Sequence, residues 1–195
     1  MSELMPYLRG EQCGKVFGIT FDDGYLNNLE FALPVLNGLG FSATCYLVHE
    51  LIGKTNSWDR SLGIEEVALM DVSEIQEWIQ GGMEVGSHTL SHAHLSALNE
   101  SEAWGEIDGS KKSLEDRLGL PIRHFCYPYG EFTEVHASMA ERAGYVSATT
   151  TQRGRASLKA KPWTLPRVPV HRSTSTPQLL WKMMTRHEDR HLQSE

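Results

Sequence analysis

Short apolar, β-branched or aromatic runs alternate along this chain with stretches whose apolar residues recur at helical spacing. The runs predict strands, and the helical spacing predicts amphipathic helices between them. The expected strands are residues 15–21, 42–48, 83–87, 123–127, 145–149 and 165–170. The expected helices are residues 26–39, 73–80, 100–118 and 134–143. Strand and helix therefore alternate over most of the chain.

Glycine, proline and serine refine the ends of these elements. Pro34 is expected to start the first helix late or to kink it, because proline has no N–H for the helical ladder. Ser73, with Gln76 three residues later, is expected to cap the second helix, which a Gly-Gly pair closes. Pro166 and Pro169 suit an edge strand, since proline cannot donate to strand pairing.

The repeated order of strand, helix and strand predicts an α/β fold, in which a parallel sheet or barrel is covered by helices. The working residues of such folds lie just beyond the carboxyl ends of the strands. Asp22 and Asp23 follow the first expected strand, His88 follows the third, and residues 127–130 follow the fourth. These residues are therefore the candidate chemistry of the chain.

Composition narrows the class of protein. The 195 residues, 40% hydrophobic and 22% charged, fit one domain over residues 1–195, with a core at about 15–171 and a C-terminal helix and polar tail at 172–195. The formal charge of −7 argues against nucleic acid as a partner. No apolar run approaches the length of a membrane span. Isolated cysteines and the lack of a leader-like start predict a cytoplasmic protein, and nothing indicates its oligomeric state.

Asp22 and Asp23 are adjacent carboxylates at the end of an apolar run. Burial of such a pair is costly, because each carboxylate raises the pKa of the other unless a cation compensates. A solvated turn is the alternative, since Asp and the following Gly24 are turn formers. The run at residues 16–21 favours a functional pair, because it aims both side chains at the end of a buried strand.

His88 and His92 are four residues apart. On a helical turn this spacing places both imidazoles on one face, where they can bind zinc. One Asp and two His ligands would leave a coordination position for water, as in catalytic zinc sites. With nine histidines in the chain, accidental pairs are expected, and His187 and His191 repeat the spacing.

Residues 187–191 also match H-E-x-x-H, the signature of zinc proteases. That motif needs a packed amphipathic helix and a further ligand, whereas this segment lies in a charged tail that no other histidine follows. A frayed, solvated terminus is the preferred interpretation. Residues 153–162 are likewise expected to form an exposed loop.

Three segments occur in a fixed order: TFDDG at 20–24, SHTLSH at 87–92 and FCYPYG at 125–130. In this order they resemble the first three motifs of the polysaccharide deacetylase family, the NodB-homology domain of family-four carbohydrate esterases. The resemblance runs from about Val16 to Val170. It implies a distorted (β/α) barrel in a single domain and a metal-dependent hydrolysis of N-acetyl groups on a sugar or polysaccharide.

The resemblance also implies roles for individual residues. Asp23, His88 and His92 would hold one divalent metal ion, most often zinc, with cobalt, manganese, nickel or iron as alternatives. Asp22 would be the general base that takes a proton from a metal-bound water, the nucleophile of the reaction. The backbone N–H of Tyr129, beside Pro128, would stabilise the oxyanion. The partner would be a carbohydrate that carries an N-acetyl group.

The chain departs from the family pattern at the third motif. Many members have there an arginine that orients the base aspartate, and here the position is Cys126. Arg167, on a neighbouring strand, is the expected substitute. The fourth motif, an Asp followed by a Trp, has no match, and Trp163 is the nearest candidate for its aromatic wall.

The fifth motif, Leu-x-His, supplies in the family the acid that protonates the leaving amine, and it too is missing. His171 is the candidate for this acid, with an ordinary loop histidine as the alternative. His94 would support the metal site rather than donate the proton. Residues 56–69, with Trp58 and Asp59, would either cover the site and stack on a sugar ring or form a solvated connection.

Three functions stay open at this point. The first is a sugar N-deacetylase. The second is an amide hydrolase of the same fold that acts on a small nitrogenous substrate. The third is a catalytically inactive carbohydrate-binding module, which the presence of all four Asp and His residues of the first two motifs disfavours.

Overall fold

The computed structural model of the chain describes residues 1–158 and 160–193. Among them, six strands form one sheet of parallel pairs in the sequential order β1 to β6. The strands are β1 (Thr20–Phe21), β2 (Thr44–Leu47), β3 (Glu84–Ser87), β4 (His124–Cys126), β5 (Ser147–Arg153) and β6 (Leu165–Arg167). The α-helices are α1 (Met5–Leu8), α2 (Leu33–Leu39), α3 (Val72–Gln80), α4 (Glu100–Leu118), α5 (Glu134–Arg142) and α6 (Thr176–Met184).

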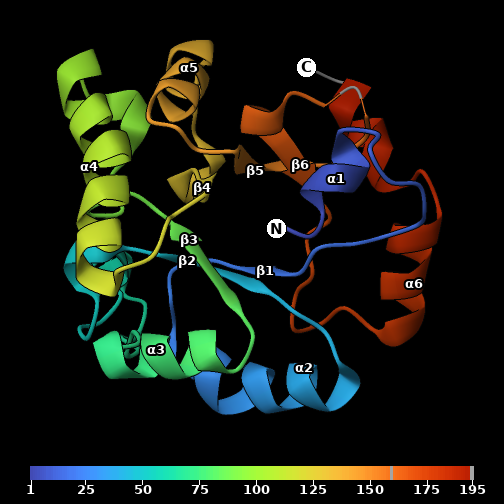
Figure 1. The fold of residues 1–195 in the computed structure, drawn as a ribbon, viewed down its shortest axis with the longest axis horizontal. Coiled ribbons are helices and arrows are strands. Elements are labelled where there is room, and N and C mark those ends of the chain that lie inside the picture. The colour runs from blue at the N-terminus through green and yellow to red at the C-terminus, as the bar shows by residue number, and fades with distance from the viewer. Residues whose placement is uncertain (159, 194–195) are drawn as a thin grey trace.

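The sheet curls into a half-barrel, and helices α2 to α6 surround it on the outside (Figure 1). This arrangement confirms the expected distorted (β/α) barrel. The two edge strands are β1 and β6, at opposite ends of the strand order. None of the described helices is long and apolar enough to span a membrane.

The core fills the space between the sheet and its helices. Phe125 of β4 has no exposed surface, and neither do Ile75 and Trp78 of α3 or Ile107 and Leu114 of α4. Burial of each such side chain contributes about 1.5–3 kcal/mol relative to an exposed one. This core fixes the strands, and the strands fix the residues that follow their carboxyl ends.

Local signals account for most helix ends. Helix α4 spans residues 100–118 as predicted, and its C-cap Gly119 has the left-handed φ of 68° that glycine tolerates. The prediction of Ser73 as the cap of α3 is wrong. Asp71 is the N-cap, and its carboxylate accepts the N–H of Glu74 in a capping box.

The first helical stretch starts late, as Pro34 predicted. Residues 28–32 form a π-helical turn, η1 (Asn28–Ala32), and the α-helix begins only at Leu33, with the proline in its first turn. The proline lacks an N–H, and the first turn of a helix is where that loss matters least.

Both edge strands are shorter than predicted. Strand β1 comprises only Thr20 and Phe21, and residues 11–18 are exposed outside the sheet. Strand β6 ends at Arg167, before Pro169, and lies at the edge, as its prolines indicated. An edge strand pairs with one neighbouring strand only, so few backbone hydrogen bonds hold its ends in the sheet.

The C-terminal segment is not a solvated tail, and that prediction is wrong. Glu188 is fully buried, and its carboxylate lies 2.8 Å from Arg153 Nε and 3.3 Å from Lys182 Nζ. Asp189 pairs with Arg155 at 2.6 Å. These pairs also show that residues 153–155 are not a free exposed loop. The side chain of His191 and residue 159 lie outside the described part of the chain.

Substitutions at two glycines test the packing of this fold, and they are expected to change the free energy of unfolding in opposite directions. A Cβ at Gly86 in β3 would lie 2.5 Å from the ring of Tyr46 and 2.8 Å from the carbonyl oxygen of His124. Gly86→Ala should therefore destabilise the fold by about 1–3 kcal/mol, as overpacking does. At Gly105, inside α4, a Cβ would meet nothing within 4 Å. Gly105→Ala should stabilise by about 0.5–1 kcal/mol.

Urea unfolding of both variants beside the wild-type chain measures these free energies. A Gly86→Ala midpoint at or above that of the wild type would show that the contact between β2, β3 and β4 is not as tight as this geometry requires.

Candidate metal centre

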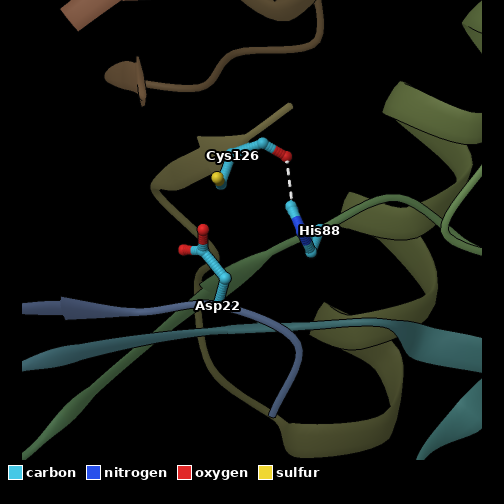
Figure 2. A group of neighbouring side chains, drawn as sticks. All are labelled: Asp22, His88 and Cys126. Carbon is cyan, nitrogen blue, oxygen red and sulfur yellow. Dashed lines mark hydrogen bonds between the residues drawn. The ribbon is translucent and has the colours of Figure 1, made fainter. Parts of the chain in front are cut away.

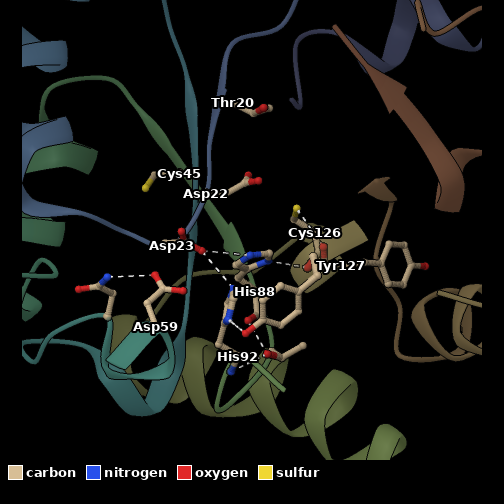
Figure 3. A network of polar contacts seen from close by, with 12 residues as sticks. Thr20, Asp22, Asp23, Cys45, Asp59, His88, His92, Cys126 and Tyr127 are labelled. Carbon is tan, nitrogen blue, oxygen red and sulfur yellow. Dashed lines mark hydrogen bonds and ion pairs between the residues drawn. The ribbon is translucent and has the colours of Figure 1, made fainter. Parts of the chain in front are cut away.

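Functional side chains gather at the carboxyl ends of four strands. Asp22 and Asp23 follow β1 directly, His88 follows β3, Cys126 ends β4 and Arg167 ends β6. Figure 3 shows Asp22, Asp23, His88, His92 and Cys126 pointing into one region. The parallel sheet explains the gathering, because its strands all end at the same edge.

Asp23, His88 and His92 form a group fit to hold a metal ion. The Nε2 atoms of both histidines lie 3.3 Å from the same oxygen, Oδ1 of Asp23. One ligand atom from each residue lies within 4.8 Å of the others. The histidines are 2% and 6% exposed, and the Asp23 side chain is 21% exposed, so the group is sheltered but open to a small ligand. Two imidazoles and one carboxylate are the donors of many catalytic zinc sites.

The surroundings of the histidines orient them for metal binding. Nδ1 of His88 donates to the carbonyl oxygen of Cys126 at 2.7 Å. That bond places a proton on Nδ1, so Nε2, which faces Asp23, is the ring atom available to bind a metal ion. Nδ1 of His92 lies 3.1 Å from the hydroxyl of Tyr129. Each imidazole is therefore held from its far side, and these residues fit a divalent ion.

Backbone strain concentrates at the same place. Within the described ranges, four residues other than glycine have a positive φ: Asp23 at 73°, Thr89 at 68°, His92 at 64° and Tyr129 at 57°. Each such residue costs on the order of 1–3 kcal/mol and persists only where the surroundings impose it. Asp23, Thr89 and His92 lie in the two loops that carry the metal group, and Tyr129 lies in the loop that contacts His92. The fold therefore holds these loops in strained conformations.

His88 and His92 do not meet on a helical turn, and that part of the prediction is wrong. Residues 88–94 are a loop, in which the left-handed Thr89 and His92 turn both imidazoles toward Asp23. The carboxylate of Glu106, on α4, accepts the N–H groups of Leu90 and Ser91 at 2.9 and 3.0 Å. The spacing of four residues thus brings the histidines together for a different geometric reason.

The charges of Asp23 and His92 suit metal ligation. Burial alone would raise the pKa of Asp23, but hydrogen bonds from His88 and His92 outweigh it and hold the pKa far below its ordinary value. Burial lowers the pKa of His92 despite the nearby Asp23 carboxylate. Asp23 is thus an anion near neutral pH, and His92 is a neutral imidazole, the forms that bind metal ions.

Arg167 makes a bidentate ion pair with Asp22. Its Nη1 and Nη2 atoms each lie 2.7 Å from a different oxygen of the carboxylate. Nη1 also donates to Thr20 Oγ1 at 3.1 Å, and Nε donates to the carbonyl oxygen of Thr150 at 2.8 Å. Burial would raise the pKa of Asp22, but the charge and hydrogen bonds of Arg167 hold it below its ordinary value. The structure thus places a guanidinium on Asp22 from β6.

A second group of possible donors, Asp22, His88 and Cys126, also has ligand atoms within 4.8 Å of one another (Figure 2). It does not suit a cation, because Arg167 already occupies both oxygens of Asp22 and lies 3.3 Å from the Cys126 sulfur. A metal ion there would meet the guanidinium charge. The small Cys126 side chain instead leaves space for Arg167.

Tyr129 and His94 lie against the metal group. The Tyr129 ring meets His92 edge to face at 4.7 Å and stacks on His94 at 3.8 Å. His94 in turn lies 3.2 Å from the Glu131 carboxylate, so it supports the site from outside. Pro128 is buried just before Tyr129 and fixes the turn. The role of the Tyr129 N–H as an oxyanion donor stays a prediction.

Two predicted residues are not brought to this group. Trp163 packs against the core, and its indole N–H donates to the carbonyl oxygen of Tyr145 at 2.9 Å. His171 is exposed in a turn, where its backbone N–H donates to Thr174 Oγ1. Its imidazole makes no hydrogen bond, ion pair or ring contact with the described residues. The proposed roles of both stay predictions without support from the geometry.

A further aromatic neighbour of the metal group is Trp58, in η3 (Ser57–Leu62), and its ring stacks on His92 at 4.2 Å with an interplanar angle of 24°. Figure 3 shows the adjacent Asp59 in the same view as Asp23 and His92. The only signal for this placement in the sequence is an insertion with a Trp and an Asp between two predicted elements. That signal shows neither the path of the loop nor its contact.

Comparison with known proteins connects this geometry to a family. The family model described as polysaccharide deacetylase matches residues 9–148. The protein YxkH of Bacillus subtilis is 31% identical over 152 residues, which cover 78% of this chain and 50% of that protein. A peptidoglycan-N-acetylglucosamine deacetylase of Bacillus cereus is 26% identical over 144 residues, or 72% of this chain and 44% of that protein. The chain thus spans about half the length of these relatives.

Among solved structures, the deacetylase PplD of Streptococcus pyogenes in complex with acetate superposes with a TM-score of 0.81. The two chains are 25% identical, and the match covers 93% of this chain and 77% of that one.

The metal group makes a direct prediction about ion binding. Asp23→Asn keeps the shape and tolerates the positive φ of this position, but it removes the charge that both histidines share. Zinc affinity should fall by at least the roughly 100-fold that the loss of an outer-shell partner can cause. Metal analysis after equilibration with zinc measures it, with the exposed Asp116→Asn as control. Unchanged stoichiometric zinc in Asp23→Asn would contradict the assignment.

Proposed function

We propose, from the premise that the chain belongs to the polysaccharide deacetylase family, that it hydrolyses N-acetyl groups on a sugar or polysaccharide in a metal-dependent reaction. The observation that carries the proposal is the position of Asp22. This carboxylate is held ionised by Arg167 and adjoins Asp23, to which both histidines turn. The names of the relatives support a carbohydrate amide as the substrate.

Asp23, His88 and His92 would hold the ion, and zinc suits this set of donors best, with other first-row ions as alternatives. A divalent ion bound there would polarise the acetamide carbonyl and lower the pKa of the attacking water. All other parts of the reaction fall to side chains and backbone of this chain.

Asp22 acts as the general base. One oxygen of its carboxylate takes the proton of the attacking water, and Arg167 keeps both oxygens in place while this happens. The protonated Asp22 then carries the proton that the leaving amine nitrogen needs. The N–H of Tyr129 donates a hydrogen bond to the carbonyl oxygen as negative charge develops on it.

Release of acetate from N-acetylglucosamine oligomers tests this function. The zinc-loaded chain should release acetate, and Asp22→Asn should lower kcat about 100- to 10,000-fold, the usual contribution of a general base. Zinc binding by Asp22→Asn should stay intact, since Asp22 is not one of the proposed ligands. A wild-type chain that binds zinc, cobalt, manganese, nickel or iron but releases no acetate would instead support an inactive carbohydrate-binding protein.

The ion pair of Arg167 with Asp22 predicts how the rate depends on pH. Asp22 must be ionised to act as a base, so the rate falls as the pH drops through its pKa. Because Arg167 holds that pKa low, Arg167→Ala should raise it and move the acid limb of the pH–rate profile to higher pH. The rate near neutral pH should fall about 100-fold, as for other misplaced catalytic groups.

The exposed Arg172→Ala is the matched control. The rate of Arg167→Lys should lie between the rates of Arg167→Ala and of this control, because lysine keeps the charge but not the bidentate geometry. An acid limb that does not move in Arg167→Ala would show that the guanidinium does not govern the base.

A further inference from the structure

Residues 53–70, termed the arm, leave the barrel after β2 and return to it before α3. Two isolated antiparallel bridges tie the arm down, Thr55 to Ala68 and Tyr25 to Leu69. The N–H of Gly53 also donates to the carbonyl oxygen of Met70 at 3.0 Å. The arm is therefore closed on itself at its base and carries η3 at its far end.

A buried amide fixes the orientation of the arm's end. Asn56 is 1% exposed, and its Oδ1 accepts the N–H of Val67 at 2.6 Å. Its Nδ2 donates to Oδ2 of Asp59 at 3.0 Å. Asp59 is thus held by a neutral group, and it makes no ion pair within the described ranges. The neighbouring Arg60 turns away to Glu66 at 2.6 Å.

Trp58 and Tyr129 enclose the imidazole of His92 between them. Trp58 stacks on it, Tyr129 meets it edge to face, and Tyr129 is itself 39% exposed. Among the described residues, Trp58 has no second ring contact. Its other face is therefore not covered by an aromatic side chain of this chain. Trp58 and Tyr129 thus form an aromatic mouth beside the metal group.

The negative charge of Asp59 reaches this mouth. Burial raises the pKa of Tyr25, and the carboxylates of Asp23 and Asp59 raise it further. Burial likewise raises the pKa of Tyr129, with Asp59 the largest of the carboxylate effects. The mouth thus combines an aromatic face with an uncompensated carboxylate. An aromatic face suits the C–H face of a sugar ring, and a carboxylate accepts hydrogen bonds from hydroxyl groups.

We propose that Trp58 and Asp59 form a subsite for a neutral hexosamine ring next to the acetamido group that is cleaved. Asp59 accepts hydrogen bonds from the hydroxyls of that ring, and its charge disfavours a ring that carries a carboxylate. This subsite rests on the proposed deacetylation, whose substrate class it narrows to neutral amino sugars.

Two variants test the subsite against matched controls. Asp59→Asn removes the charge and keeps the shape, and Trp58→Ala removes the aromatic face. The controls are the exposed Asp116→Asn and Trp181→Ala. The substrates are neutral N-acetylglucosamine oligomers, the same oligomers with a carboxylate-bearing neighbouring ring, and a small acetamide with no sugar ring.

Asp59→Asn should raise KM for the neutral oligomers about tenfold or more, as the loss of a hydrogen bond to a charged group predicts, and leave kcat nearly unchanged. Asp59→Asn should also reduce the difference in KM between the neutral and the carboxylated oligomers. Trp58→Ala should raise KM for both oligomers about 2- to 10-fold. The rate of small-acetamide hydrolysis should change less than that of the oligomers in both variants, because this substrate has no sugar ring to place in the subsite.

Binding is measured separately from turnover. Calorimetric titration of the oligomers into the zinc-loaded chain in an Asp22→Asn background reports the subsite whether or not acetate is released. Failure of acetate release alone overturns the proposed function, whereas unchanged oligomer affinity in Asp59→Asn and Trp58→Ala overturns the subsite. An equal loss of activity on all three substrates, together with weaker zinc binding, would also overturn the subsite, because the arm would then only position His92.

Discussion

The ion pair between Arg167 and Asp22 joins the two edges of the curled sheet. Asp22 follows β1 and Arg167 ends β6, so two hydrogen bonds of 2.7 Å connect residues 145 positions apart in sequence. The same guanidinium contacts Thr20 before Asp22 and the carbonyl oxygen of Thr150 on β5. Without Arg167, a partly buried carboxylate would be left without its charge partner, which would destabilise the fold. The position of the base and the closure of the fold thus depend on one contact.

Two adjacent, partly buried carboxylates are held by two different sets of partners. Arg167 neutralises Asp22 from one side, while the imidazoles of His88 and His92 hold Asp23 from the other. A metal ion bound by Asp23 would therefore not need to neutralise the negative charge of Asp22 as well. This separation lets Asp22 stay free as a base while its neighbour serves as a ligand.

The sequence predicted those parts of the site that follow from the parallel sheet. Asp22, Asp23, His88 and Arg167 stand at strand ends, and the strand order alone brings them to one edge. The arm could not be predicted, because Trp58 reaches His92 through a loop held by the buried Asn56. The left-handed conformations of Thr89 and His92 carry no signal in residue type, so a helical turn was expected in their place. The burial of Glu188 also needs partners that lie far away in sequence.

The third motif has Cys126 where many family members have an arginine, and the position of Arg167 explains this difference. Cys126 ends β4, two strands away from Arg167 on β6, yet its sulfur lies 3.3 Å from the guanidinium. A long side chain at position 126 would compete with Arg167 for this space, whereas a small thiol accepts a hydrogen bond from it. A guanidinium can therefore reach Asp22 from either strand, provided that the other strand leaves room. Here it comes from an edge strand with a single neighbour, so the ionisation of the base is coupled to how firmly that edge is held.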